Sequence, residues 1–283
     1  MGLARLQAAF ATTDRTEPLL NVYCTAGYPT RESTGVVMRA LSEAGVDVIE
    51  LGMPYSDPLA DGETIQASST QALRGGITLP RIFEQVAEVR ASVDPPIVLM
   101  GYYNQVLRYG TEGFLDACVA SGVDGLILPD LPLEIYEREF AAGLIARDLG
   151  ISLLVTPRTP AERIRRIDRL TRGFLYVVSS SATTGSRAGT LQGQRAYFER
   201  LAGMGLSSPL LIGFNVATAS DLAATAEFAA GGIIGSAFIR ALDERDVASS
   251  ARTFVEEVRG RSAGRSATPT PRRAPDQGGR GSS

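Results

Sequence analysis

The chain has 283 residues, which suits one large α/β domain or two small ones, and 44% of them are apolar, which is ample for a core. Its formal charge is −3. Because four Arg and one Asp give residues 262–283 a charge of +3, residues 1–261 carry −6. An acidic body argues against nucleic-acid binding, which needs a basic face. All 28 basic residues are Arg, and there is no His. Acid–base chemistry must therefore fall to Glu, Asp, Tyr, Cys or water.

The first residues precede no long apolar segment, so we expect no signal peptide. No apolar run approaches the roughly 18 residues of a membrane span. The two cysteines, Cys24 and Cys118, are too few for a disulfide framework and indicate a reducing compartment. We therefore expect a cytoplasmic protein that does not enter a membrane.

Short apolar runs alternate with longer amphipathic segments along most of the chain. Strands are predicted at 19–25, 47–52, 96–101, 125–129, 151–156, 174–179, 209–213 and 232–235. Helices are predicted at 31–44, 62–73, 78–92, 111–121, 133–148, 160–171, 193–204, 218–230, 236–243 and 247–260. Eight strand–helix units in about 240 residues indicate an α/β protein of the (β/α)8 TIM barrel type rather than an open sheet. Continuous apolar runs are typical of buried parallel strands.

The two ends of the chain lie outside this repeat. An extra N-terminal helix over 2–12 is expected to close the bottom of the barrel. Residues 262–283 contain no Val, Ile, Leu or aromatic side chain, and this predicts a disordered, basic, Pro/Gly/Ser-rich tail after a catalytic domain over 1–261. The tail could contact an anionic partner, but a solvated terminus is the preferred interpretation.

Residues 48–62 read VIELGMPYSDPLADG and contain three carboxylates. Glu50 falls at the end of a predicted strand, and Asp57 and Asp61 follow in a Pro-stiffened loop. A buried strand-end acid is costly unless it has a partner or a function, and barrels of this type place their chemistry in the loops after the strands. Asp61 could instead cap the helix that begins at Glu63, and Asp57 could shape a turn. The combination within one motif favours a catalytic role.

Three Gly-bearing turns, at 183–186, 213–215 and 235–236, occur late in the chain. The last begins a helix directly after the eighth predicted strand. Barrels often bind phosphate at this place, where backbone N–H groups and a helix N-terminus favour an anion. The turns together predict a phosphate site.

Aromatic residues at the strand ends are less specific. Tyr23, Tyr102, Tyr176 and Phe214 could line an aromatic pocket or could simply pack inside the barrel. The segment 180–192 is polar, Gly-rich and follows the sixth predicted strand. Long loops of this kind often act as lids.

At this point the sequence resembles a known family. Residues 48–62 closely resemble the signature of the tryptophan synthase alpha subunit, and the similarity extends over roughly residues 3–260. It includes YCTAGYP at 23–29, GVDGLILPDLP at 122–132, the Thr-Thr-Gly loop and GSA at 235–237. The resemblance implies a (β/α)8 barrel that cleaves indole-3-glycerol phosphate to indole and glyceraldehyde 3-phosphate in a retro-aldol reaction. It also implies a beta subunit as partner, in an α2β2 heterotetramer, which uses pyridoxal phosphate to make L-tryptophan from the indole.

The resemblance assigns Glu50 and Asp61 as catalytic acids. Glu50 would handle the proton at indole C3 and the proton of the glycerol hydroxyl. Asp61 would accept a hydrogen bond from the indole N–H. The substrate would contact Tyr23, Tyr102, Tyr176, Phe214 and Thr184, and the phosphate would lie against the backbone at Gly185, Asn215, Gly235 and Ser236. The loop 54–62 and the lid 180–192 would close the site and meet the beta subunit.

The sequence departs from the family pattern in two places. Ser180, Ser181 and Ala182 stand where the family often has Arg-Ala-Gly, and Asn215 replaces a frequent Gly. Asn keeps the backbone N–H and tolerates a left-handed backbone better than most residues.

The residue inventory agrees with this chemistry. A retro-aldol step needs an electron sink, and without Lys or His neither a Schiff-base aldolase nor a His-ligated metal site is possible. The substrate must supply the sink, and indole protonated at C3 does so if one carboxyl group holds a proton and another stays charged. Burial should raise the pKa of Glu50, and a more polar loop should leave Asp61 ionised.

Three other functions compete with this one. They are a stand-alone lyase that releases free indole, a non-catalytic barrel that activates a beta subunit, and a different phosphate-binding barrel enzyme such as an isomerase. The Glu50–Asp61 pair argues against the last two. A stand-alone lyase would need the same residues, so only the finding of a partner subunit distinguishes it from an alpha subunit. We expect no cofactor and no metal in this chain, since it lacks the Lys of a pyridoxal phosphate aldimine.

Overall fold

The computed structural model describes residues 2–11, 16–58, 61–179, 194–213 and 215–261. One parallel sheet contains the strands β1 (Leu19–Thr25), β2 (Val48–Gly52), β3 (Ile97–Met100), β4 (Gly125–Ile127), β5 (Gly150–Ile151), β6 (Leu154–Val155), β7 (Leu175–Val178), β8 (Leu210–Gly213) and β9 (Gly231–Ile234). The strand order is β5-β4-β3-β2-β1-β9-β8-β7-β6. β1 agrees with its prediction residue for residue.

The sheet closes through the segment predicted as one strand at 151–156. β5 pairs with β4 and β6 pairs with β7, and only Ser152 and Leu153 separate β5 from β6. The Ser152 N–H donates to the Leu126 carbonyl at 2.9 Å, and the Leu153 carbonyl accepts from Tyr176 N–H at 2.9 Å. The two short strands are therefore one barrel strand with a local break, and the (β/α)8 prediction is confirmed.

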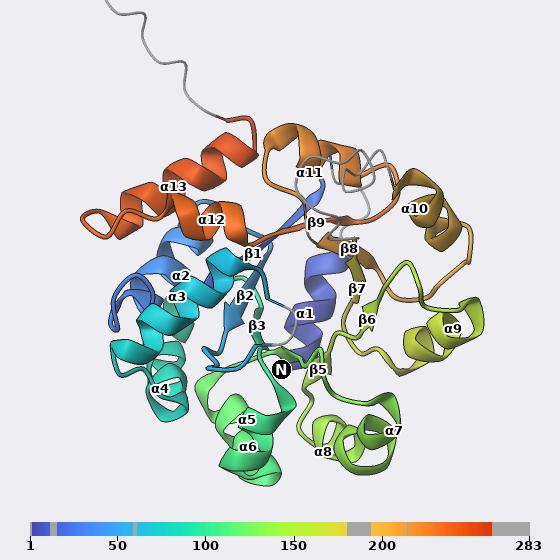
Figure 1. Ribbon diagram of the computed structural model, residues 1–283, viewed down its shortest axis with the longest axis horizontal. Helices are drawn as coiled ribbons and strands as arrows, with labels where there is room; N and C mark the ends of the chain where they lie inside the picture. Colours follow the sequence, from blue (N-terminus) through green and yellow to red (C-terminus); the bar gives the residue numbers. More distant parts are fainter. Residues whose placement is uncertain (1, 12–15, 59–60, 180–193, 214, 262–283) are drawn as a thin grey trace, which may run out of the picture.

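Helices surround the strands as an outer ring, except for α1, which lies within that ring in Figure 1. The helices are α1 (Gly2–Phe10), α2 (Ser33–Glu43), α3 (Glu63–Arg74), α4 (Leu79–Val89), α5 (Tyr103–Tyr109), α6 (Thr111–Ser121), α7 (Leu133–Ile135), α8 (Ala141–Ala146), α9 (Ala161–Leu170), α10 (Arg195–Ala202), α11 (Ala219–Thr225), α12 (Ser236–Ala241) and α13 (Val247–Val258). α5 has no predicted counterpart, and a π-helical turn at Tyr136–Phe140 divides the helix predicted at 133–148. None of the described helices has the length and apolar character to cross a membrane.

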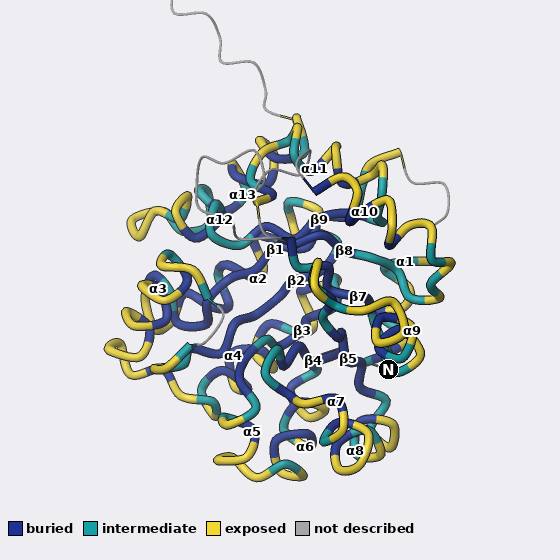
Figure 2. Tube along the Cα trace, turned by 45° about the vertical axis from the view of Figure 1, so that its right-hand side comes forward, coloured by how far each residue is buried: buried dark blue, intermediate teal, exposed yellow. Residues whose placement is uncertain are grey.

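Alternation along the strands builds two cores. Leu20 and Val22 point outward and pack in the layer between strands and helices, whereas Leu19, Val48 and Phe174 point inward and fill the barrel. Figure 2 shows the result, with buried strands inside and exposed surface on the outer helices.

The N-terminal helix α1 closes one end of the barrel, as predicted. Leu6 is fully buried within the inner cluster, and the Arg5 guanidinium lies 2.7 Å from Asp124 Oδ1. A Cβ at Gly150 would lie 2.8 Å from Leu6 Cδ2, and one at Gly125 would lie 3.1 Å from it. The glycines at the starts of β4 and β5 thus admit the helix at this end of the strands.

Candidate active site

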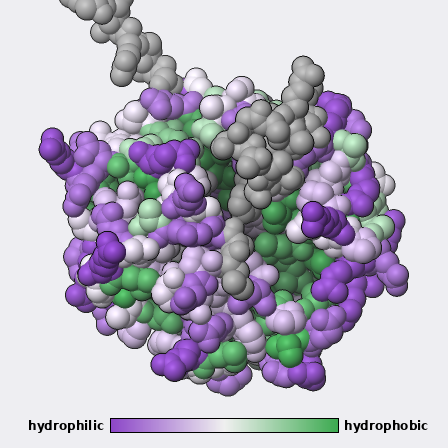
Figure 3. Space-filling model, viewed as in Figure 1, coloured by the Kyte–Doolittle hydropathy of each residue, from purple (hydrophilic) through white to green (hydrophobic). Residues whose placement is uncertain are grey.

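A pocket of about 420 Å³ lies at the carboxyl ends of the strands. It brings together seven predicted site residues: Tyr23, Glu50, Asp61, Tyr176, Asn215, Gly235 and Ser236. In Figure 3, hydrophilic residues dominate the periphery of the molecule and an extended hydrophobic area lies right of the centre. Some predicted site residues lie outside the described residues. They are Thr184, Gly185, Phe214 and the predicted lid 180–192, which includes the departures from the family pattern at 180–182.

Glu50 is a fully buried carboxyl group in the wall of the barrel. Its neighbours Ile49 and Leu51 pack in the outer layer, so alternation directs Glu50 inward. Its Oε2 accepts a hydrogen bond from Asn21 Nδ2 at 3.0 Å. Burial raises the pKa of Glu50 to about 8; the charge of Asp61 also raises it and the bond from Asn21 lowers it. At neutral pH this group holds a proton that it can donate.

Asp61 lies in the loop between β2 and α3. The Tyr102 hydroxyl donates to Asp61 Oδ2 at 3.0 Å. The cap position of α3 belongs to Gly62, with no side-chain capping bond, so the helix-capping alternative for Asp61 is wrong. Burial raises the pKa of Asp61 and the bond from Tyr102 lowers it. The polar sequence of the loop gave no sign of this burial.

Tyr102 lies beside Asp61 and not among the residues that line the pocket. Its ring stacks on Tyr55 with centroids 5.0 Å apart, and its side chain is buried. It therefore supports the carboxylate of Asp61.

Tyr23 and Tyr176 both line the pocket and both are buried. A Cβ at Gly52 would lie 2.1 Å from the Tyr23 hydroxyl, and one at Gly213 would lie 2.4 Å from the Tyr176 ring. Each tyrosine thus lies over the backbone of a neighbouring strand. Burial raises the pKa of both phenols, so they remain neutral hydrogen-bonding groups. Tyr176 also packs in the inner core of the barrel, so the same side chain both lines the pocket and fills the barrel interior.

Asn215, Gly235 and Ser236 lie together at the pocket. Asn215 has a φ of 58°, the left-handed conformation that its side chain tolerates. Its Nδ2 lies 3.4 Å from the Ser179 hydroxyl. Gly235 directly precedes α12, as the phosphate-site prediction requires.

Several pocket residues were missed by sequence reasoning. The Arg240 guanidinium lines the pocket and donates to Thr64 Oγ1 at 3.1 Å, which connects α12 to α3. Ile65, Met100 and Ile233 form apolar wall, and in the sequence they resemble ordinary core residues. Asn21 had a usable signal, because it is an amide in an otherwise apolar strand.

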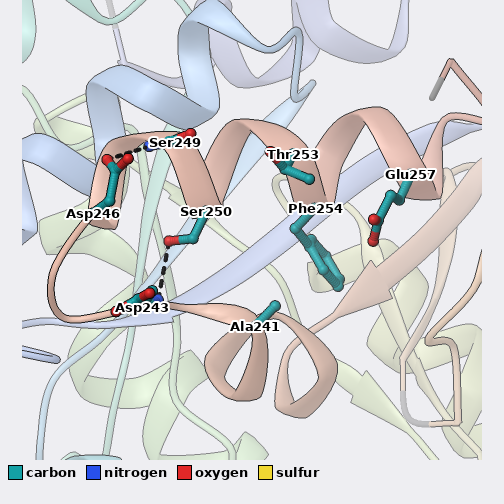
Figure 4. A pocket seen from close by; sticks show the side chains of 8 residues that line it. All are labelled: Ala241, Asp243, Asp246, Ser249, Ser250, Thr253, Phe254 and Glu257. Atoms are coloured by element: carbon teal, nitrogen blue, oxygen red, sulfur yellow. Dashed lines mark hydrogen bonds between the residues drawn. The ribbon is translucent and has the colours of Figure 1, made fainter. Parts of the chain in front are cut away.

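A second hollow of about 360 Å³ lies between α12 and α13 and contains three acidic residues (Figure 4). Its polar groups are engaged in the local turn, because Asp246 accepts from Ser249 N–H at 3.2 Å and Asp243 N–H donates to Ser250 Oγ at 3.0 Å. Glu257 completes the acidic set. Nowhere in the described part of the chain do three His, Cys, Asp or Glu side chains form a group that could hold a metal ion.

Comparison with known proteins identifies the family. The family model for the tryptophan synthase alpha chain matches residues 10–264. The tryptophan synthase alpha chain of Flavobacterium johnsoniae is 44% identical over 241 residues, which cover 85% of this chain and 95% of the relative. A solved alpha chain from Legionella pneumophila superposes with a TM-score of 0.80 at 31% identity, covering 91% of this chain and 96% of that one. A structure of the tryptophan synthase α2β2 complex from Pyrococcus furiosus gives a TM-score of 0.79 at 36% identity, covering 86% and 98%. The chain belongs to the tryptophan synthase alpha chain family.

Proposed function

We propose that Glu50 and Asp61 are the two catalytic carboxyl groups of the reaction. The family defines that reaction: the chain is a lyase of tryptophan synthesis that cleaves indole-3-glycerol phosphate to indole and glyceraldehyde 3-phosphate. The observation that carries the assignment is the pair of shielded carboxyl groups in one pocket, each hydrogen-bonded by a neutral donor.

In this proposal Glu50 donates its proton to indole C3, which turns the ring into a cationic iminium. The C–C bond to the glycerol chain then breaks, and its electron pair returns to the ring to restore indole. The glycerol hydroxyl loses its proton to Glu50 as the aldehyde forms, so the acid is regenerated. Asp61 accepts a hydrogen bond from the indole N–H and stabilises the positive charge in the intermediate.

We place the indole against the aromatic and apolar wall and the phosphate at the other predicted residues. Tyr23 and Tyr176 would flank the ring, while Tyr102 would act through Asp61. The phosphate would meet the backbone at Asn215, Gly235 and Ser236, with Thr184, Gly185 and Phe214 remaining predicted contacts.

The cofactor and location remain predictions. We expect this chain to use no cofactor, and the pyridoxal phosphate to belong to the beta subunit. Cys24 and Cys118 are both buried thiols without a disulfide, which suits the predicted cytoplasmic location.

The direct test is Glu50→Gln. Gln keeps the shape and loses the proton, so kcat for indole formation should fall by roughly two to four powers of ten. Substrate binding, measured by isothermal titration, should persist. A variant that retains more than about a tenth of the wild-type kcat would remove Glu50 from the catalytic role.

The family works with a beta subunit, and we propose that this chain binds its partner on the surface formed by α5 and the loop after β2. A hollow of about 430 Å³ lies there, lined by Tyr55, Leu79, Pro80, Asn104, Gln105, Arg108 and Tyr109. Leu107 next to it is 53% exposed. An apolar surface of this kind on the catalytic side suits a protein partner and an α2β2 assembly.

This surface connects directly to Asp61. Asn104 Nδ2 donates to the Tyr55 hydroxyl at 2.9 Å, Tyr55 stacks on Tyr102, and Tyr102 donates to Asp61. A partner that fixes Tyr55 would therefore also fix the second carboxylate. Couplings of this kind are typically about 1–3 kcal/mol, or roughly 5–150-fold.

The test is to titrate the chain with the beta subunit of the same organism and to follow indole formation from indole-3-glycerol phosphate. The rate should rise to a plateau, and Leu107→Asp should shift that titration to higher beta-subunit concentrations while leaving the basal rate unchanged. A high basal rate that stays constant throughout would favour the stand-alone lyase.

A further inference from the structure

Asn21 is a polar residue in the interior of the barrel. It lies on β1 one inward position below Tyr23, in register with Val48 and Ile233. Its side chain is fully buried, and its Nδ2 contacts Glu50 Oε2. A buried amide in an apolar layer is costly unless it is hydrogen-bonded, and the bond to Glu50 offsets this cost for Nδ2.

We propose that Asn21 is a positioning residue that holds Oε2 of Glu50 and leaves Oε1 as the oxygen that exchanges protons with the substrate. This inference rests on the catalytic role proposed for Glu50. It concerns which carboxyl oxygen of Glu50 exchanges the proton and which residue fixes the plane of the carboxyl group.

The argument starts from the two carboxyl oxygens. Oε2 of Glu50 accepts the N–H of Asn21, whereas Oε1, which is also buried, has no hydrogen-bond partner among the described residues. A proton on Oε2 would compete with the donated N–H, so the acid form carries its proton on Oε1. In the anionic form the bond from Asn21 becomes charge-assisted and stronger. Asn21 therefore orients the acid and also favours its ionisation.

The other groups around Glu50 do not duplicate this effect. The β2–α3 loop contributes Asp61, whose charge raises the pKa of Glu50. β1 and β7 contribute the neutral phenols of Tyr23 and Tyr176, and α12 contributes Arg240 to the same pocket. The outward thiol of Cys24 on β1 is also neutral, because burial raises its pKa. On β3, Val98 and Met100 carry no charge. Asn21 is the described residue that donates a hydrogen bond to Glu50.

The experiment compares wild type with Asn21→Leu, which keeps the approximate shape without the donor, and with Asn21→Val, which suits a strand. The matched control is Ser121→Ala, which removes a buried side-chain bond to the Ala117 carbonyl on the outer helix α6. A ¹³C NMR titration of the Glu50 carboxyl, assigned by its loss in Glu50→Gln, reports its pKa without substrate. The pH profiles of kcat and KM report its function.

We expect the Glu50 pKa to rise by about one unit in both Asn21 variants and to stay constant in Ser121→Ala. Because Glu50 acts in its protonated form, activity is lost as pH rises through its pKa, so the alkaline limb of kcat should move upward by the same amount. At neutral pH kcat should fall about tenfold and KM should change less than about twofold, since orientation is lost but binding is kept. An NMR pKa and an alkaline limb that stay at their wild-type positions in both variants would overturn the proposal.

The NMR titration separates this inference from the proposed function. If wild type and Glu50→Gln cleave the substrate equally, the catalytic role of Glu50 fails, whatever the titration gives. If Glu50→Gln is inactive and the Asn21 variants leave the Glu50 pKa and the pH profile unchanged, the catalytic role stands and the positioning role of Asn21 fails.

Discussion

Replacing Tyr102 by Phe tests how Asp61 is kept charged. The substitution removes one hydroxyl, which donates to Asp61 Oδ2 at 3.0 Å, and keeps the ring that stacks on Tyr55. A hydrogen bond to a charged group contributes about 1.5–3 kcal/mol. Because Asp61 is partly exposed, we take the lower end, which corresponds to about one unit of pKa.

The sign follows from the role of Asp61. The bond from Tyr102 lowers the pKa of Asp61 against the effect of burial, so its loss should raise that pKa. The reaction needs Asp61 as an anion, and activity is lost as pH falls through its pKa. The acid limb of kcat should therefore move about one unit toward neutral pH, while the melting temperature changes little because the packing is kept.

The assay is steady-state indole formation between pH 5 and 9, with the beta subunit present. Tyr103→Phe is the matched control, because it removes a hydroxyl from the next residue, whose ring packs on Phe140 instead of near Asp61. An acid limb at the same pH in wild type and Tyr102→Phe would refute the idea that this hydroxyl keeps Asp61 ionised.

Three further outcomes are expected. Asp61→Asn should reduce kcat by at least about tenfold with an unchanged melting temperature, because Asn cannot stabilise the indole cation; wild-type turnover would exclude the electrostatic role. In urea denaturation, Glu50→Gln should be more stable than wild type at pH 8, and this difference should shrink toward pH 5. The reason is that burial raises the pKa of Glu50 from 4.5 to about 8 in the folded state, so the stability of the wild type falls as pH rises across that window. A stability difference that stays constant with pH would contradict this. Deleting 263–283 should change neither melting temperature nor lyase activity, since the segment has no apolar surface to bury, and a melting temperature several degrees lower would show that the tail docks.

The fold was largely predictable because buried parallel strands are continuous apolar runs. β1 has the predicted bounds, and most other strands shift by a residue or two at their ends. The break between β5 and β6 could not be predicted from the sequence of 151–156, because it depends on how Ser152 and Leu153 bond to neighbours on opposite sides. α5 was missed because its seven residues bury only Val106 and give no apolar stripe.

The site was predictable only for residues whose chemistry is visible in the motif. Glu50 and Asp61 stand out as carboxylates at a strand end and in a stiff loop. The hydrogen bond from Tyr102 to Asp61 could not be predicted, because it depends on how the loop after β2 folds. Asn21 acts across two strands, and only the register of β1 and β2 brings it to Glu50.

The two carboxyl groups differ in environment although each has one neutral donor. Among the described residues, no Arg pairs with either carboxyl group. A guanidinium beside Glu50 would favour the anion and remove the proton that the reaction needs. Deeper burial holds Glu50 as an acid, whereas partial exposure and the Tyr102 hydroxyl favour the charged form of Asp61. In the proposed mechanism Glu50 gives up and regains the proton while Asp61 stays charged. Depth in the barrel and neutral hydrogen-bond donors would set this difference in a protein without His or Lys.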